Sequence, residues 1–111
     1  MEQIYNKLVR DRIPEKIKSN GETPIIKILN DIDYKRELEK KLYEEYNEVI
    51  KASGMDRIEE LADMIEVICA LAKLENKTLD DVISVADKKN EKRGAFEDKI
   101  YLKKVLTNDV K

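Results

Sequence analysis

The stretch that decides the predicted fold is DRIEELADMIEVICALAKL, residues 56–74. Asp56 is followed three residues later by Glu59, a capping-box pattern that predicts a helix with Asp56 as N-cap, running to about Leu74. Apolar side chains nearly encircle this helix, and such a helix is normally central and covered on several sides. We therefore expect a bundle in which it also contributes to a homodimer or tetramer. Its apolar residues are Ile58, Leu61, Ala62, Met64, Ile65, Val67, Ile68, Cys69, Leu71, Ala72 and Leu74.

Two further long helices are predicted on either side of this stretch. Apolar residues at helical spacing predict a helix over about Tyr34–Ala52, and the Ser-Gly pair at 53–54 ends it. Thr78 is a suitable N-cap for a third helix, which ends near Arg93 with Gly94 as its C′ residue. The apolar positions of the first of these helices are Leu38, Leu42, Tyr46, Val49 and Ile50.

The two ends of the chain are predicted to be less helical. An extended arm over Ile4–Arg12 leads into a short helix, Pro14–Ser19, which begins at a proline. The segment near residues 25–29 is short and rich in β-branched residues, and the segment near 100–106 alternates apolar and polar residues. Both patterns predict strands, which we expect to pair with each other. The predicted fold is therefore mainly α, an antiparallel helical bundle with a small two-stranded β element. Residues 1–111 are expected to form a single domain.

Composition narrows the chemistry that is available. The 22 basic and 24 acidic residues nearly balance, so no basic field for nucleic acid is expected. The chain has no histidine, which excludes His-based triads and His-ligated zinc. Cys69 is the one cysteine, and a reducing compartment is the simplest setting. There is no signal-peptide pattern, and no apolar run approaches the roughly 20 residues that span a bilayer. We therefore expect a cytoplasmic protein without membrane association.

Four carboxylates on the two central helices are the candidate metal ligands. Glu45 lies within the apolar face of the first helix, and Glu48 lies at the edge of that face. Glu60 and Asp63 flank an apolar stripe of the second helix. Unpaired carboxylates on core-facing positions cost several kcal/mol, and a divalent cation such as Mg²⁺ offsets that cost through hard oxygen ligands. The alternative is that these acids pair with the many lysines on a solvated face.

Basic residues in two places could bind phosphates near such a metal. Lys89 shares the inner face of the third helix, and Arg93 lies one turn further on. The alternative is that these two cations complement the dipole of their helix end. Lys7 and Arg10 lie in the N-terminal arm, where interleaved apolar residues suggest that the arm packs down rather than remaining a solvated tail.

The chain resembles a known family in four segments, taken in order. Residues 5–15, YNKLVRDRIPE, resemble the KLVRDKIPE start of small MazG-like proteins. These proteins are often labelled phosphoribosyl-ATP pyrophosphohydrolase-like, and they belong to the all-α NTP pyrophosphatase superfamily. The resemblance continues through EEYNE at 44–48, EELADMIEVI at 59–68 and KNEKRGAF at 89–96. It covers nearly the whole chain, although Ala95 replaces the glycine that is commoner in the last motif.

The resemblance implies a metal site and an activity. The superfamily holds Mg²⁺ with Glu-x-x-Glu on one helix and Glu-x-x-Asp on the next, which here correspond to Glu45, Glu48, Glu60 and Asp63. Glu44 is the alternative first ligand, but its position on the helix places it outside the apolar face. Mg²⁺, or Mn²⁺ as a substitute, lowers the pKa of a bound water that attacks the substrate, releasing a nucleoside monophosphate and pyrophosphate. The phosphate-binding residues would be Lys7, Arg10, Lys89 and Arg93.

The implied function is hydrolysis of canonical or modified nucleoside triphosphates. One alternative within enzymes is phosphoribosyl-ATP pyrophosphatase activity, which turnover of that substrate against a nucleotide panel would separate. The other alternative is a non-catalytic helical module for nucleotide binding or interaction, in which the acidic cluster is structural. That module would show no Mg²⁺-dependent hydrolysis.

Overall fold

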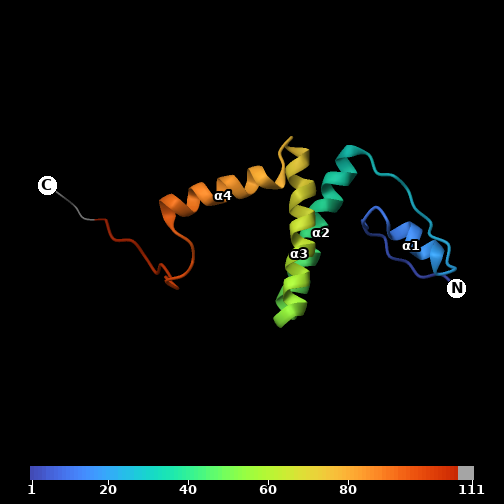
Figure 1. Ribbon diagram of the computed structural model, residues 1–111, viewed down its shortest axis with the longest axis horizontal. Helices are drawn as coiled ribbons and strands as arrows, with labels where there is room; N and C mark the ends of the chain where they lie inside the picture. The colour runs from blue at the N-terminus through green and yellow to red at the C-terminus, as the bar shows by residue number, and fades with distance from the viewer. Residues whose placement is uncertain (108–111) are drawn as a thin grey trace. The chain divides into compact units, whose positions relative to one another are not determined.

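The computed structural model describes residues 1–107, and in this range the chain forms four helices (Figure 1). A first unit spans Met1–Leu79, and a second unit starts at Asp80. The mainly helical class predicted from the sequence is confirmed. The helices are α1 (Ile13–Ser19), α2 (Asp31–Lys51), α3 (Gly54–Leu74) and α4 (Leu79–Arg93).

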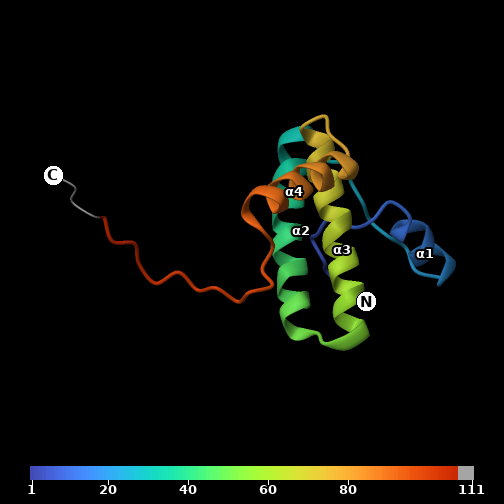
Figure 2. The ribbon, with the colours of Figure 1, turned by 60° about the vertical axis from the view of Figure 1, so that its left-hand side comes forward.

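Within the first unit, α2 and α3 form an antiparallel hairpin and lie side by side (Figure 2). Ala52 and Ser53 alone join the two helices, and both have extended backbone angles. The chain then enters α3 through Gly54 at φ +59°, a left-handed conformation that glycine adopts readily because it has no Cβ. Such a short link keeps consecutive helices as antiparallel neighbours, so the turn fixes which residues of α2 face which residues of α3.

The N-cap predicted for α3 is wrong. The helix begins at Gly54, two residues before Asp56, and Ser53 is at the N-cap position without a side-chain cap hydrogen bond. Asp56 instead lies in the first turn, where a carboxylate is favoured by the positive end of the helix dipole. The acidic pattern therefore indicated the right turn of the helix but the wrong residue as its boundary.

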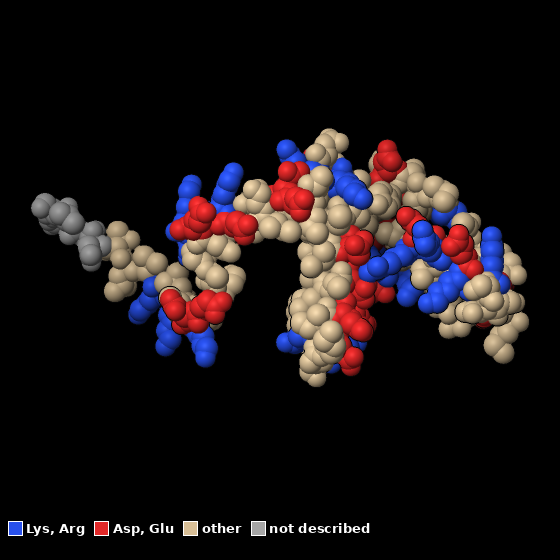
Figure 3. All heavy atoms as spheres, in the orientation of Figure 1, with Lys and Arg blue, Asp and Glu red and all other residues tan. Residues whose placement is uncertain are grey.

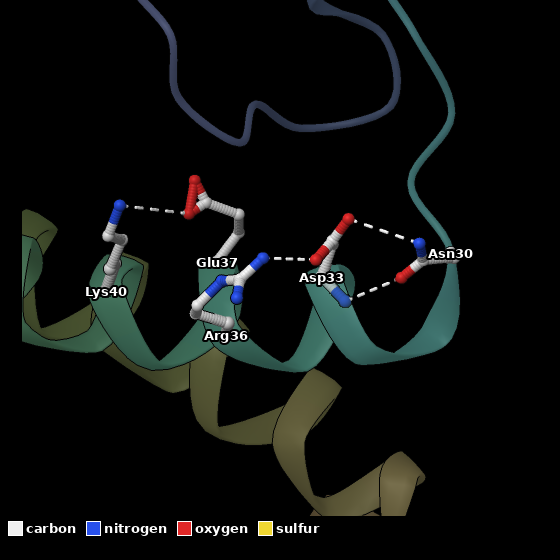
Figure 4. Close-up of polar contacts among 5 residues, drawn as sticks. All are labelled: Asn30, Asp33, Arg36, Glu37 and Lys40. Carbon is white, nitrogen blue, oxygen red and sulfur yellow. Dashed lines mark hydrogen bonds and ion pairs between the residues drawn. The ribbon is translucent and has the colours of Figure 1, made fainter.

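The start of α2 is fixed by a side-chain cap at Asn30. The Asp33 backbone N–H donates to Asn30 Oδ1 at 2.8 Å, and Asn30 Nδ2 donates to Asp33 Oδ2 at 3.2 Å (Figure 4). Arg36 pairs with the other oxygen of Asp33. The helix therefore begins at Asp31 rather than near Tyr34, because the cap adds a turn before the apolar repeat of the helix begins.

Asn30→Ala should destabilise the protein by about 1 kcal/mol, because it leaves the Asp33 N–H without its side-chain acceptor. Urea unfolding at one fixed protein concentration measures this loss. Asn30→Ser is the matched control, since serine also caps helix N-termini and should remain near the wild-type stability. Equal losses in the two variants would show that the cap oxygen does not stabilise α2.

The predicted two-stranded β element is wrong for the residues that the structure describes. Neither residues 25–29 nor residues 100–106 form a strand, and Ile25 and Ile28 are about nine-tenths exposed. β-branched residues suit a strand, but an extended segment becomes one only when a partner completes its ladder of hydrogen bonds. These two segments find no such partner between residues 1 and 107.

The buried apolar core is small. Its members are Leu38 of α2 with Val67 and Ala72 of α3, and neither α1 nor α4 has a buried residue. Within the first unit, α2 is the helix that packs on α3, so the prediction that α3 is covered on several sides is not met there. The large exposed apolar side chains of the hairpin are Ile32, Tyr43, Tyr46, Ile50, Met55, Ile58, Leu61, Ile65 and Leu74.

The second unit consists of most of α4 and the segment after it. As predicted, α4 begins directly after Thr78 and ends at Arg93. Gly94 follows at φ +78°, and its N–H donates to the carbonyl of Asn90 at 2.8 Å. None of the helices formed by residues 1–107 has the length and apolar character needed to cross a membrane.

Candidate metal centre

Three of the four predicted ligands come together on the hairpin. Glu45 of α2 and Glu60 and Asp63 of α3 each offer one carboxylate oxygen, and these three oxygens lie within 4.8 Å of one another. The geometry of the turn explains the meeting. Glu45 lies six residues before the end of α2, and Glu60 lies six residues after the start of α3. At 1.5 Å per residue, both are about 9 Å from the link, and Asp63 follows Glu60 by one turn on the same face.

Burial and like charges make two of these carboxyls, Glu45 and Glu60, costly to ionise. Glu45 is 9% exposed, and its burial raises the pKa of its carboxyl, a change that Lys41 opposes and the charges of Asp63 and Glu60 increase. Partial loss of hydration also raises the pKa of Glu60, and the nearby charges of Asp63 and Glu48 raise it further. Loss of hydration is the larger cause for both carboxyls, and a cation placed among the oxygens would favour their ionised forms.

Glu48 is outside this group of three. Its side chain is exposed, although its charge is near enough to raise the pKa of Glu60. Its predicted role as a ligand therefore stays a prediction. Glu44, the alternative first ligand, is about 40% exposed, and its carboxylate pairs with Lys7 at 3.7 Å and Lys41 at 3.4 Å. These positions favour Glu45 over Glu44 as the ligand from α2.

The N-terminal arm brings one cation to the cluster and a second to the neighbouring Glu44. Arg10 Nη2 donates to Asp63 Oδ1 at 2.6 Å, and Lys7 Nζ lies 3.7 Å from Glu44 Oε1. Acidic side chains gather along the hairpin, with basic side chains beside them (Figure 3). Both predicted arm residues lie beside the acidic face, but most side chains of the arm are exposed, so the predicted packing of the arm is met only in part.

Sequence reasoning missed Lys41. Its Nζ lies 3.9 Å from Glu45 Oε1, and its side chain is about 19% exposed. Lys41 precedes Glu45 by four positions, a spacing at which oppositely charged side chains meet on one helix face. That spacing could have identified Lys41 before the structure was known.

The arm and α2 also enclose a small hollow of about 240 Å³. The trace of the arm passes over Glu37 and Lys40, whose side chains point toward it (Figure 4). Glu37 Oε2 is buried without a hydrogen bond, and its nearest cation is Lys40 Nζ at 3.5 Å. The lining therefore combines an aromatic ring, three lysines and two acids. It consists of Tyr5, Asn6, Lys7, Leu8, Glu37, Lys40, Lys41 and Glu44.

The other predicted phosphate-binding residues lie outside the first unit. Lys89 and Arg93 are on α4, and both are exposed. Arg93 is in the last turn of α4, where a cation also complements the helix dipole. Their predicted part in the site stays a prediction.

Comparison with known proteins finds a relative for part of the chain. An uncharacterized protein of Mycolicibacterium smegmatis (strain ATCC 700084 / mc(2)155) is 49% identical over 49 residues, which are 44% of this chain. The match covers 50% of that protein, so the chain spans about half the length of the curated relative it matches. No protein-family profile matches the chain, and no solved structure matches it.

Proposed function

We propose that this chain is a Mg²⁺-dependent nucleoside triphosphate pyrophosphohydrolase of the MazG-like group, which splits a nucleoside triphosphate into a monophosphate and pyrophosphate. The observation that carries the proposal is the convergence of Glu45, Glu60 and Asp63 from two adjacent helices. These are three of the four positions at which the family resemblance expects metal ligands.

The chemistry of this cluster fits Mg²⁺. Carboxylate oxygens are the hard ligands that Mg²⁺ prefers, and octahedral bonds of about 2.1 Å place coordinated oxygens roughly 3–4 Å apart. The three oxygens lie within 4.8 Å of one another, which is near this range. The raised pKa values of Glu45 and Glu60 give the same indication, because a divalent cation would stabilise the ionised forms that burial and neighbouring carboxylates disfavour.

The residues divide into two roles in this proposal. Glu45, Glu60 and Asp63 hold the metal, with Glu48 available from the next turn of α2. Lys7 and Arg10 of the arm bind phosphate oxygens through charge-assisted hydrogen bonds. When bound, Mg²⁺, or Mn²⁺ in its place, neutralises charge on the phosphates and lowers the pKa of an attacking water.

We further propose that the active protein is a homodimer or tetramer in the cytoplasm. A chain of this length needs more apolar burial than three small or medium side chains provide. Ile58, Leu61 and Ile65 follow one another at helical spacing along α3 and are 54%, 39% and 45% exposed. A second copy of the hairpin would cover this stripe with an equivalent surface, as twofold interfaces do.

Release of pyrophosphate from a panel of canonical and modified nucleoside triphosphates, including phosphoribosyl-ATP, tests the proposed activity. We expect release in the presence of Mg²⁺ and none with EDTA, because phosphate charge and the attacking water both depend on the metal. The substrate that turns over fastest identifies the specificity. No release from any substrate, together with no Mg²⁺ binding by calorimetry, would contradict the proposal and favour the non-catalytic module.

A further inference from the structure

One of the cations that contact the cluster comes from the N-terminal arm of the chain itself. Arg10 donates to Asp63 Oδ1 at 2.6 Å, although the two residues are 53 positions apart in the sequence. Asp63 is also one of the three residues whose oxygens converge. The guanidinium therefore contacts a carboxylate that the proposed function assigns to the metal.

A divalent cation and this guanidinium compete for Asp63. Both need the negative charge of the same small carboxylate, and each repels the other at the few ångströms that separate neighbours in the cluster. The ion pair is also accessible, since the side chains of Arg10 and Asp63 are 59% and 44% exposed. An exposed pair of this kind is weak and opens readily.

Few other contacts hold this part of the arm. Lys7 Nζ is 3.7 Å from Glu44 Oε1, and Leu8 is half-buried, whereas Tyr5 and Val9 are exposed. Opening of the Arg10–Asp63 pair therefore removes the shorter of the two ion pairs that join the described arm to the hairpin.

We propose that residues 4–12 form a strap, in which Arg10 holds Asp63 in the metal-free protein and a divalent cation must displace it to gain that ligand. The strap is a regulatory feature of the proposed metal centre, and it rests on the proposed function. Displacement frees the guanidinium of Arg10 beside the metal at the moment when an anionic substrate can bind.

Metal affinity tests the strap directly. The probe is Mn²⁺ alone, whose free concentration is read from its electron paramagnetic resonance signal. We expect Arg10→Gln to bind Mn²⁺ about two- to fivefold more tightly than wild type, the range set by a typical exposed ion pair. The matched control is Arg12→Gln, which removes the same charge two positions away in the arm. Arg12 makes no ion pair in the described part of the chain, and its substitution should change the affinity less.

Movement of the arm gives a second measurement. The chain has no tryptophan, so Tyr5→Trp places a unique fluorophore in the strap. We expect its emission to change on titration with diamagnetic Mg²⁺, with the midpoint of metal binding, and to change less when Arg10→Gln is added.

The possible results distinguish a failure of the strap proposal from a failure of the proposed function. Equal Mn²⁺ affinities for wild type and Arg10→Gln would overturn the strap and leave the proposed metal centre intact. Unchanged fluorescence of Tyr5→Trp while the metal binds would do the same. Absence of Mn²⁺ binding in all variants would overturn the proposed function and the strap together.

Discussion

Glu45→Gln should lower Mg²⁺-dependent pyrophosphate release by at least about 100-fold. Glu45 is the most buried member of the cluster and the one contributed by α2, so its loss leaves the ligands of a single helix. Substitution of a residue that only hydrogen-bonds to a metal ligand already lowers metal affinity or activity 10- to 100-fold. Loss of the ligand itself should lower activity further. Steady-state rates with saturating Mg²⁺ and substrate, measured beside metal affinity, report the effect.

Two controls separate loss of the ligand from loss of the fold. Glu39→Gln removes an exposed carboxylate from the same helix and should retain nearly full activity. Glu45→Gln should also keep or raise the Tm measured in EDTA. The pKa of the Glu45 carboxyl is raised in the folded state. The contribution of Glu45 to the free energy of unfolding is therefore complete below its unfolded-state pKa, and it is lost as pH rises through its folded-state pKa. At neutral pH the charged form therefore disfavours folding. Full activity in Glu45→Gln would remove Glu45 from the metal centre.

Ile65→Lys should weaken self-association by about 30-fold or more, equivalent to about 2 kcal/mol for a central interface residue. Ile65 belongs to the exposed apolar stripe of α3, where a lysine in a twofold interface would meet its own copy and lose hydration. Sedimentation equilibrium across a range of protein concentrations measures the change. The Tm should also fall more steeply on dilution than it does for wild type.

Glu66→Lys is the matched control for this prediction. Glu66 is the next residue on α3 and is exposed, but it projects about 100° away from Ile65 around the helix. Its substitution should leave the association constant nearly unchanged. A wild-type protein that remains monomeric at all concentrations would contradict the oligomer and would leave the exposed stripe unexplained.

The helices and the convergence of three of the four predicted carboxylates could be anticipated because their signals are local. Helical spacing of apolar residues located α2 and α3, and the inward register of Glu45 distinguished it from Glu44. The link at residues 52–53 then made the helices antiparallel neighbours, which is enough to bring Glu45 opposite Glu60. Helical spacing alone could not show that Glu48 lies outside the group of converging carboxylates. A residue at the edge of a helix face is exposed or buried according to how the neighbouring helix packs.

The features that could not be predicted depend on distant partners. The segments near 25–29 and 100–106 have the composition of strands, but pairing is a property of two segments and not of either one. The pairing of Arg10 with Asp63 joins positions 53 residues apart, and no spacing rule connects them. Asn30 was missed for a different reason, because a polar cap adds residues to a helix before its apolar repeat becomes visible.

The position of the cluster beside a two-residue turn has a consequence for the order of folding. Glu45 and Asp63 are 18 positions apart, whereas Arg10 and Asp63 are separated by 53. Closing the longer loop costs about 1 kcal/mol more in chain entropy, and contacts between nearby residues form faster. The three carboxylates should therefore converge as soon as the hairpin forms, before the arm arrives. A newly made chain would meet the divalent cations of its surroundings first and its own arginine second.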